Sequence, residues 1–228
     1  MRILHLISHL RLGAGKHVVE TSRAQARRGH DVMVGVSPDV DNHWRTDPSM
    51  ALQLAQAGVA CREIGDFFHR DLSSLLVSAK RLRLMQQGSK PFDVWHAHSG
   101  PAVAFARWSG AGRVVMTCHG FGPGRDAMFD LQDALALRLA DVVISPSRYW
   151  ADRLETGFGL SRVHIIPYGL DLSQYPRVRN DRVREKRSPF RILCLAELTW
   201  RKGVDLLIRA APLVAARSGP LEIHLYGN

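Results

Sequence analysis

A glycine-rich segment near the amino end has residue types and a spacing that suit anion binding. The apolar run from Ile3 to Ile7 leads into polar residues, and Gly13-Ala14-Gly15 then opens a segment whose apolar residues recur at helical spacing. This pattern predicts a strand, a glycine turn and a helix whose free N–H groups point beyond the carboxyl end of the strand. We therefore expect Gly13, Ala14 and Gly15 to approach a phosphate.

Two familiar phosphate-binding motifs do not fit this segment. A dinucleotide fingerprint needs a third glycine, and Val18 stands in its place. A Walker loop is excluded because Lys16 follows Gly15 directly, without the four-residue spacer or a following Ser or Thr. The alternative to phosphate binding is a tight turn that lets the helix pack closely against the strand.

A second candidate anion site lies near the carboxyl end of the sequence. The loop AELTWRKG places Arg201 and Lys202 directly before a predicted helix over Val204 to Ala216. Cations beside free helix N–H groups favour an anion, and across a cleft from the first glycine segment they could hold a pyrophosphate. The alternative is a pair of exposed cations before a surface helix.

Histidines follow two of the predicted strands at their carboxyl ends. His96 and His98 alternate on FDVWHAH, and His119 with a glycine-rich stretch follows VVMTC. Two histidines on one side of a strand could ligate a metal, but no third ligand stands at a matching spacing, so we expect no metal. In a parallel sheet the loops after the first, fourth and fifth strands can meet around one ligand site.

Strand and helix patterns alternate along the whole chain, which predicts an α/β fold with a parallel sheet. Seven strands are expected before the basic stretch 177–188, and a strand–helix–strand unit after it. In three of the helices we expect a leucine-rich stripe to face inward. These stripes are Leu72, Leu75, Leu76, Ala79, Leu82 and Met85; then Leu131, Leu135 and Leu139; and finally Leu206, Leu207, Ala210, Leu213 and Val214.

Composition restricts the partners and the compartment. The 228 residues carry a formal net charge of +10, densest over 177–187, with almost no aromatic residues between the basic ones. A solvated linker or attraction to an anionic membrane surface explains this better than nucleic-acid binding, which we do not expect. Three dispersed cysteines, and the lack of a signal peptide or membrane-spanning run, predict a cytoplasmic protein that could be peripheral on the inner face of the membrane.

Six segments, in order over nearly the whole chain, make the sequence resemble the GT4 family of retaining glycosyltransferases with GT-B architecture. They are GAGKHV, DVWHAHS, VVMTCHG, DVVISPSRYWADRL, VHIIPYGLDLSQYP and LAELTWRKGVDLLIRA. The resemblance implies an acceptor-side Rossmann-like domain over 1–176, a basic linker over 177–188 and the beginning of a nucleotide-sugar-binding domain over 189–228. It implies transfer without a metal or other cofactor.

The resemblance also implies roles for individual residues. Gly13 to Gly15 match the segment that approaches the donor phosphates, and Arg201 with Lys202 match the cations that neutralise the leaving diphosphate. His119 matches the histidine that contacts the transferred sugar, so we predict it as the catalytic residue. His98 and Ser99 match the region that faces the acceptor.

Three departures from the family pattern carry expectations of their own. Glu197 replaces a phosphate-binding arginine and would repel a diphosphate unless Arg201 pairs with it. Tyr168 replaces the asparagine of the I-P-N-G turn, which we expect to alter only the turn. The family's donor-binding E-x7-E segment is not in this sequence, so we expect a longer enzyme, a second chain that completes the domain, or a protein without transfer activity.

The sequence as a whole predicts a glycosyltransferase that moves a sugar from a nucleotide-diphosphate donor to an acceptor hydroxyl with retention of configuration. The expected acceptor is a glycan or a lipid-linked intermediate of cell-envelope glycan, polysaccharide or glycolipid biosynthesis. The first alternative is a binding module that recognises a glycan or pairs with a catalytic subunit. A more distant alternative is an NAD-dependent oxidoreductase, since Asp39 stands near the acidic position that such enzymes use.

Overall fold

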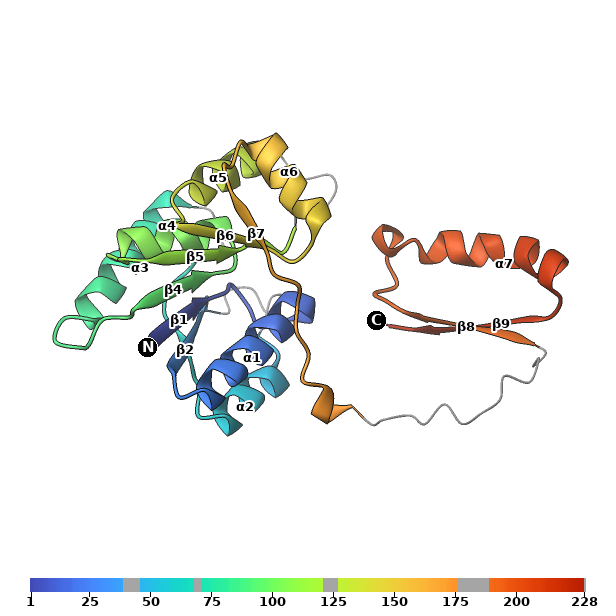
Figure 1. Cartoon of the computed structure of the whole chain (residues 1–228), viewed down its shortest axis with the longest axis horizontal. Coiled ribbons are helices and arrows are strands. Elements are labelled where there is room, and N and C mark those ends of the chain that lie inside the picture. Colours follow the sequence, from blue (N-terminus) through green and yellow to red (C-terminus); the bar gives the residue numbers. More distant parts are fainter. Residues whose placement is uncertain (39–45, 68–70, 121–126, 176–188, 228) are drawn as a thin grey trace. The chain divides into compact units, whose positions relative to one another are not determined.

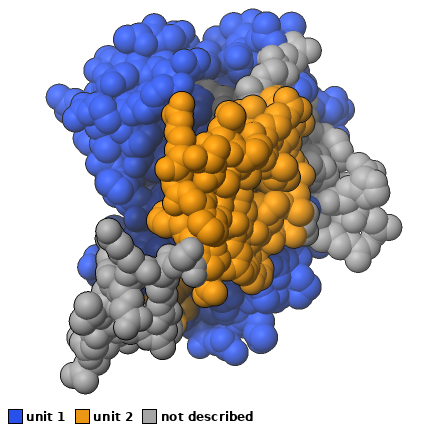
Figure 2. Space-filling view, turned by 90° about the vertical axis from the view of Figure 1, so that its right-hand side faces the viewer, with its two compact units in different colours: residues 1–172 blue, residues 173–228 orange. Residues whose placement is uncertain are grey.

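A computed structural model describes residues 1–38, 46–67, 71–120, 127–175 and 189–227. The basic stretch 177–188, Asp39 and the glycines at 122 and 124 lie outside these ranges. The chain divides into two compact units, Met1–Leu172 and Ser173–Asn228, which Figure 2 shows in different colours. Each unit is described below by itself.

The first unit is built on a parallel sheet of seven strands in the order β3-β2-β1-β4-β5-β6-β7. All seven strands occur where the sequence predicts them, which confirms the α/β class. Their bounds are β1 Arg2–Leu6, β2 Asp31–Val36, β3 Ala60–Glu63, β4 Val94–Ala97, β5 Val114–Thr117, β6 Val142–Ser145 and β7 Val163–Ile165.

Six helices connect these strands and cover both faces of the sheet (Figure 1). They are α1 Leu12–Arg27, α2 Pro48–Gln56, α3 Leu72–Met85, α4 Gly100–Trp108, α5 Ala127–Leu137 and α6 Arg148–Phe158. The helices α1 and α2 pack on one face with Ile3, Val18 and Val34, and α3 to α5 pack on the other with Leu4, Phe105 and Met116. Alternate residues of each strand therefore supply two separate apolar layers, as in other doubly wound sheets.

Local sequence signals fix several helix ends. Side chains of Asp71, Ser99 and Ser147 accept hydrogen bonds from backbone N–H groups in the first turns of α3, α4 and α6. The first helix ends at Arg28 and Gly29, where Gly29 has a φ of +80°. A glycine tolerates this left-handed conformation without steric cost.

The predicted inward stripes are wrong in part. On α5 the leucines Leu131 and Leu135 are exposed, as is Leu139 just beyond its end, and Asp133, Ala136 and Leu137 are the buried residues. On α3, among the side chains that the structure describes, Leu75, Ala79 and Leu82 are buried, while Leu72 and Leu76 are exposed. Neighbouring helices occupy the space beside the sheet, so each helix buries a narrower stripe than its leucine content suggests.

The second unit contains the parallel pair β8 Phe190–Leu195 and β9 Leu221–Tyr226, the helix α7 Val204–Ser218 and a short 3₁₀ turn Trp200–Lys202. Val204 is its one buried hydrophobic residue among those described. Leu206 and Leu213 are exposed, contrary to prediction, and Leu193 and Leu195 leave an apolar strand face uncovered.

The two glycines at the start of α1 differ in what surrounds them. A Cβ atom on Gly15 would lie 2.7 Å from the carbonyl carbon of Leu10, whereas a Cβ on Gly13 would have no atom within 4 Å.

We predict that Gly15→Ala lowers the free energy of unfolding by about 1–3 kcal/mol, because the backbone at Leu10 must move. The matched control Gly13→Ala should be neutral or raise it by up to about 1 kcal/mol, since alanine favours the helix. Urea denaturation of both variants checks this, and equal effects would contradict it.

Candidate functional site

The topology of the sheet places the candidate site. The strand order reverses between β1 and β4, because the chain moves outward to β2 and β3 from one side and to β5, β6 and β7 from the other. In open parallel sheets, ligands bind outside the carboxyl ends of the strands at such a switch point. The helices α1 and α4 both begin there, directly after β1 and β4. Their first turns therefore direct free N–H groups to this edge.

The residues predicted to bind phosphate form the first turn of α1. Gly13 is exposed, Ala14 is half-buried and Gly15 is buried against Leu10. The residue before them, Leu12, has a φ of 51°, the one positive value among non-glycine residues in the described ranges. A leucine in this conformation is strained by about 1 kcal/mol or more, so the entry to α1 is held in place by the surrounding structure.

Five histidines gather at the same edge of the sheet. In the pairing of β1 with β4, His5 lies opposite His96, and the rings of His96 and His98 stack with centroids 4.5 Å apart. The ring of His119 stacks on that of His98 at 5.2 Å, and the ring of His17, from α1, lies edge-on to His119 at 5.5 Å. The loops after the first, fourth and fifth strands thus meet, as predicted.

The sequence analysis missed His5 and His17 and misjudged Tyr168. His17 lies one helical turn after Gly13, a spacing that could have marked it. Tyr168 was expected to alter only the turn in which it lies, and that expectation is wrong: its hydroxyl is hydrogen bonded to His119 Nδ1, and its ring lies 4.5 Å from that of His17. A residue that follows the last strand enters the site because β7 is parallel to the others and ends at the same edge.

His98 and Ser99, predicted on the acceptor side, lie at the switch point. His98 is buried; its Nε2 lies 3.1 Å from His5 Nδ1, and its Nδ1 lies 3.0 Å from His119 Nε2. Ser99 caps α4, since its hydroxyl accepts a hydrogen bond from the backbone N–H of Ala102 at 3.3 Å. Ser99 therefore has a structural role whatever ligand it contacts.

Burial keeps these imidazoles neutral. Loss of solvation lowers the pKa of His5 and that of His119 to about 4, and it lowers the pKa of His17 as well. The pKa values of His96 and His98 fall well below the ordinary value for the same reason, and the neighbouring histidines lower them further. Burial also raises the pKa of Tyr168 to about 12. The site is thus a set of neutral donors and acceptors at neutral pH.

Three of these histidines come close enough to be considered as metal ligands. One ring nitrogen from each of His5, His96 and His98 lies within 4.8 Å of the others. His5 is the third histidine that sequence spacing could not supply, because it comes from a different strand. The three rings are already hydrogen bonded, His5 to His98 and His96 Nε2 to Thr117 Oγ1 at 2.7 Å. Hydrogen bonds to neighbouring side chains thus already occupy a ring nitrogen of each of these three histidines.

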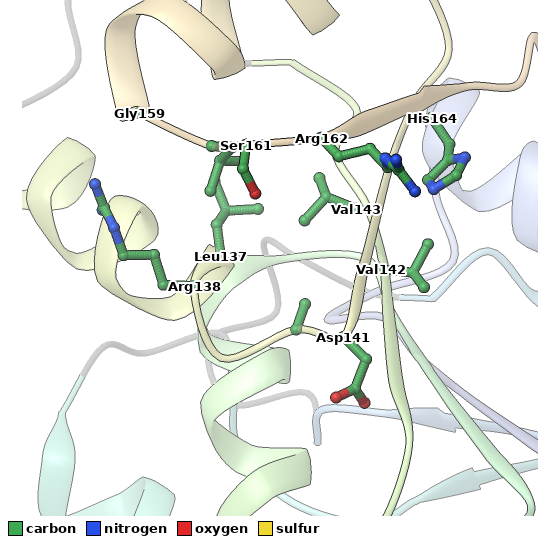
Figure 3. Close-up of a pocket in the computed structure, with 11 residues that line it drawn as sticks. Leu137, Arg138, Asp141, Val142, Val143, Gly159, Ser161, Arg162 and His164 are labelled. Atoms are coloured by element: carbon green, nitrogen blue, oxygen red, sulfur yellow. The ribbon is translucent and has the colours of Figure 1, made fainter.

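A cavity of about 270 Å³ lies away from this cluster, between α5, α6 and the amino-terminal ends of β6 and β7 (Figure 3). Asp141, at its rim, is paired with Arg107 at 2.8 Å. Because ligands of parallel sheets bind at the carboxyl edge, we do not assign this cavity to the candidate site.

In the second unit, Arg201 and Lys202 are exposed in the 3₁₀ turn before α7. Arg201 Nη2 lies 2.9 Å from a carboxylate oxygen of Glu197, so Arg201 does pair with the acid that replaces the family's arginine. The predicted cleft between this turn and the start of α1 stays a prediction.

Comparison with known proteins identifies the class. Residues 12–174 match the family model of Glycosyltransferase Family 4. The chain belongs to this family. The match begins at the first turn of α1 and ends beyond Tyr168, so it contains most of the histidine cluster.

The chain is also similar to individual proteins named as glycosyltransferases or synthases. A GDP-mannose-dependent alpha-(1-6)-phosphatidylinositol monomannoside mannosyltransferase from Mycolicibacterium smegmatis is 35% identical over 149 residues, which cover 59% of this chain and 38% of the relative. A glycogen synthase from Mycobacterium tuberculosis is 26% identical over 228 residues, 88% of this chain and 54% of the relative. The chain thus spans between about a third and just over half of these relatives.

Solved structures confirm the GT-B-like fold class. A sucrose-phosphate synthase from Thermosynechococcus elongatus has a TM-score of 0.69 at 16% identity, over 100% of this chain and 62% of that protein. Anabaena Alr3699/HepE, solved in complex with UDP and glucose, has a TM-score of 0.66 at 20% identity, over 99% of this chain and 60% of that protein. Among the described helices, none is both long and apolar enough to cross a bilayer.

The buried histidines predict a dependence of stability on pH. An unfolded histidine takes up a proton near pH 6.5, whereas the folded rings stay neutral to about pH 4. Between these values the unfolded state binds more protons, so stability falls as pH falls. The slope is up to about 1.4 kcal/mol per pH unit for each histidine. Thermal melts from pH 7 to 5 measure it above the range where carboxylates titrate.

A matched pair of variants tests whether the buried histidines cause this dependence of stability on pH. His17→Gln should make the acid slope shallower by up to one proton, because a group that is protonated in the unfolded chain alone is removed. The same substitution at His164, exposed on β7, is the matched control. A melting temperature that stays constant from pH 7 to 5 in the unaltered protein would show that the rings are not held neutral.

Proposed function

We propose that this protein takes part in transfer of a sugar from a nucleotide-diphosphate donor to an acceptor hydroxyl, with retention of configuration and without a metal or other cofactor. The observation that carries the proposal is that the family match spans the residues which converge on the carboxyl edge of the seven-stranded sheet. The alternative, a glycan-binding module without transfer activity, predicts no nucleotide binding.

The proposed sugar transfer requires stabilisation of the negative charge that develops on the leaving diphosphate. When a nucleoside diphosphate leaves, charge concentrates on its phosphate oxygens, and fixed cations and N–H groups stabilise that charge in the transition state. We assign this role to Arg201 and Lys202 beside the start of α7, and to the first turn of α1 with Gly13 to Gly15. His119 is the proposed contact to the transferred sugar, and His98 with Ser99 form the proposed acceptor side.

The acceptor is proposed to be a lipid-linked or polysaccharide intermediate at the cytoplasmic face of a membrane. The mannosyltransferase relative is named for a phosphatidylinositol acceptor. On α3, Leu72, Leu76 and Val77 are between 47% and 69% exposed, and Lys80 with Arg81 are exposed on the same helix. Leu72 also lines an apolar groove of about 340 Å³ between α3, α4 and α5. Apolar side chains flanked by cations favour an anionic membrane surface.

Nucleotide binding tests the proposed donor site. Addition of GDP, UDP or ADP should raise the melting temperature of the protein for at least one nucleotide, since a ligand that binds the folded state stabilises it. Arg201→Ala should reduce this shift, because it removes a cation from the diphosphate. The exposed Arg209 on α7, replaced by alanine, is the control. No shift with any of the three nucleotides supports the binding-module alternative.

The ion pair of Arg201 provides a sharper test. Glu197→Gln should increase the nucleotide-induced shift, because a carboxylate that repels the diphosphate and partly neutralises Arg201 is removed. Asp205→Asn is the matched control, since Asp205 makes an equivalent i,i+4 pair with Arg209 at 3.7 Å. Equal responses of the two variants would show that the turn at Arg201 does not contact the phosphates.

Vesicle sedimentation tests the membrane surface. At low salt the protein should sediment with anionic vesicles and not with neutral ones, and Arg81→Glu should release it because each basic residue near the surface contributes about 1 kcal/mol. Arg153→Glu on α6 is the matched charge reversal and should have a smaller effect. Failure of the unaltered protein to sediment would remove the membrane part of the proposal.

A further inference from the structure

A continuous line of hydrogen bonds crosses the carboxyl edge of the sheet from α1 to the turn after β7. Gln25 Oε1 lies 2.8 Å from His5 Nε2, and His5 Nδ1 lies 3.1 Å from His98 Nε2. His98 Nδ1 lies 3.0 Å from His119 Nε2, and His119 Nδ1 meets the hydroxyl of Tyr168. Four segments far apart in sequence are joined in this way, and every histidine in the line uses both ring nitrogens.

A neutral imidazole carries one N–H, so each ring in such a line donates on one side and accepts on the other. The amide oxygen of Gln25 can only accept, so His5 must carry its proton on Nε2. His5 Nδ1 then accepts from His98 Nε2, and His98 Nδ1 accepts from His119 Nε2. The remaining nitrogen, His119 Nδ1, accepts from the Tyr168 hydroxyl. One fixed acceptor at the start therefore sets the direction of all four hydrogen bonds.

We propose that Gln25 is a positioning residue that, through His5 and His98, fixes His119 as the Nε2–H tautomer and makes the Tyr168 hydroxyl the donor at the end of the line. Gln25 lies on the second half of α1 and contacts His119 only through the two intervening rings.

The surroundings of the line favour a single direction. His5 has no exposed surface, and His98 is 6% exposed, so water does not compete for their nitrogens. Their lowered pKa values keep the rings neutral, and the raised pKa of Tyr168 keeps its proton available for donation. A carboxylate in place of Gln25 would also accept from His5, but it would stabilise a charged ring, which a neutral amide does not.

The consequence for transfer rests on the proposed function. His119 is then a neutral group with both nitrogens occupied, which suits orientation of a sugar better than proton transfer. The Tyr168 oxygen donates its proton inward and keeps lone pairs to accept a hydrogen bond from a ligand hydroxyl. Tyr168 is 41% exposed, so its oxygen is accessible. The polar atom presented to the ligand is thus fixed by a residue that does not touch it.

The test is the tautomer of each histidine, read by ¹⁵N NMR of the ¹⁵N-histidine-labelled protein at neutral pH without nucleotide or acceptor. We expect His5, His98 and His119 as Nε2–H tautomers, with Nδ1 of each unprotonated. In Gln25→Met the acceptor is lost, and the Nε2–H fraction of all three rings should fall together. Gln25→Glu should retain the Nε2–H tautomers and raise the pH at which His5 titrates.

Gln53→Met is the matched control, because Gln53 is half-buried on α2 and takes no part in the line. It should leave all tautomers unchanged. A Nδ1–H tautomer at His119 in the unaltered protein would overturn the proposal, and so would a His119 that is unaffected in Gln25→Met. If Gln25→Met does not fold, the tautomers of the unaltered protein and of Gln25→Glu decide. Because these spectra are recorded without a sugar donor or a sugar acceptor, a negative result for the tautomers is separate from a negative result for nucleotide binding.

Discussion

The pairing of β1 with β4 is the constraint on which the candidate site depends. Its register sets His5 opposite His96, and it brings the strand that precedes α1 next to the strand that precedes α4. Both helices then begin at the same edge of the sheet, and His98 reaches His5 across the strand boundary at 3.1 Å. A shift of the register by one residue would turn His5 to the opposite face, because side chains alternate along a strand.

Buried imidazoles are unfavourable unless their polar atoms are hydrogen bonded, and the structure meets this requirement for His5 and His98 by joining them to each other, to Gln25 and to His119. By contrast, Nδ1 of His17 is buried without a hydrogen-bond partner among the described residues. His96 is hydrogen bonded to Thr117 on β5 and not to another histidine. The result is a polar layer on the α1 face, where the apolar packing of Ile3, Val18 and Val34 ends. Such a layer is rigid when it is fully hydrogen bonded.

The two units differ in how completely they bury their apolar residues. The first has apolar layers on both faces of seven strands, whereas the described part of the second leaves Leu193 and Leu195 more than 60% exposed on two strands. In this unit, Glu197 forms an ion pair with Arg201, four residues away. This pair means that the effective charge offered to a phosphate is smaller than the sequence suggests.

The sequence by itself determined the strands, the order of the elements and the family, because these depend on local periodicity and on motifs such as the glycines in the first turn of α1. It also placed His98 and His119 at strand ends. Only the tertiary structure decided which side chains meet: His5, His17, Gln25 and Tyr168 are separated from one another or from His119 by many residues, and strand order and register bring them together. The prediction of buried leucines was wrong for the same reason. Leu135 and Leu139 recur at helical spacing, but whether such a stripe faces the sheet depends on the positions of α3 and α4.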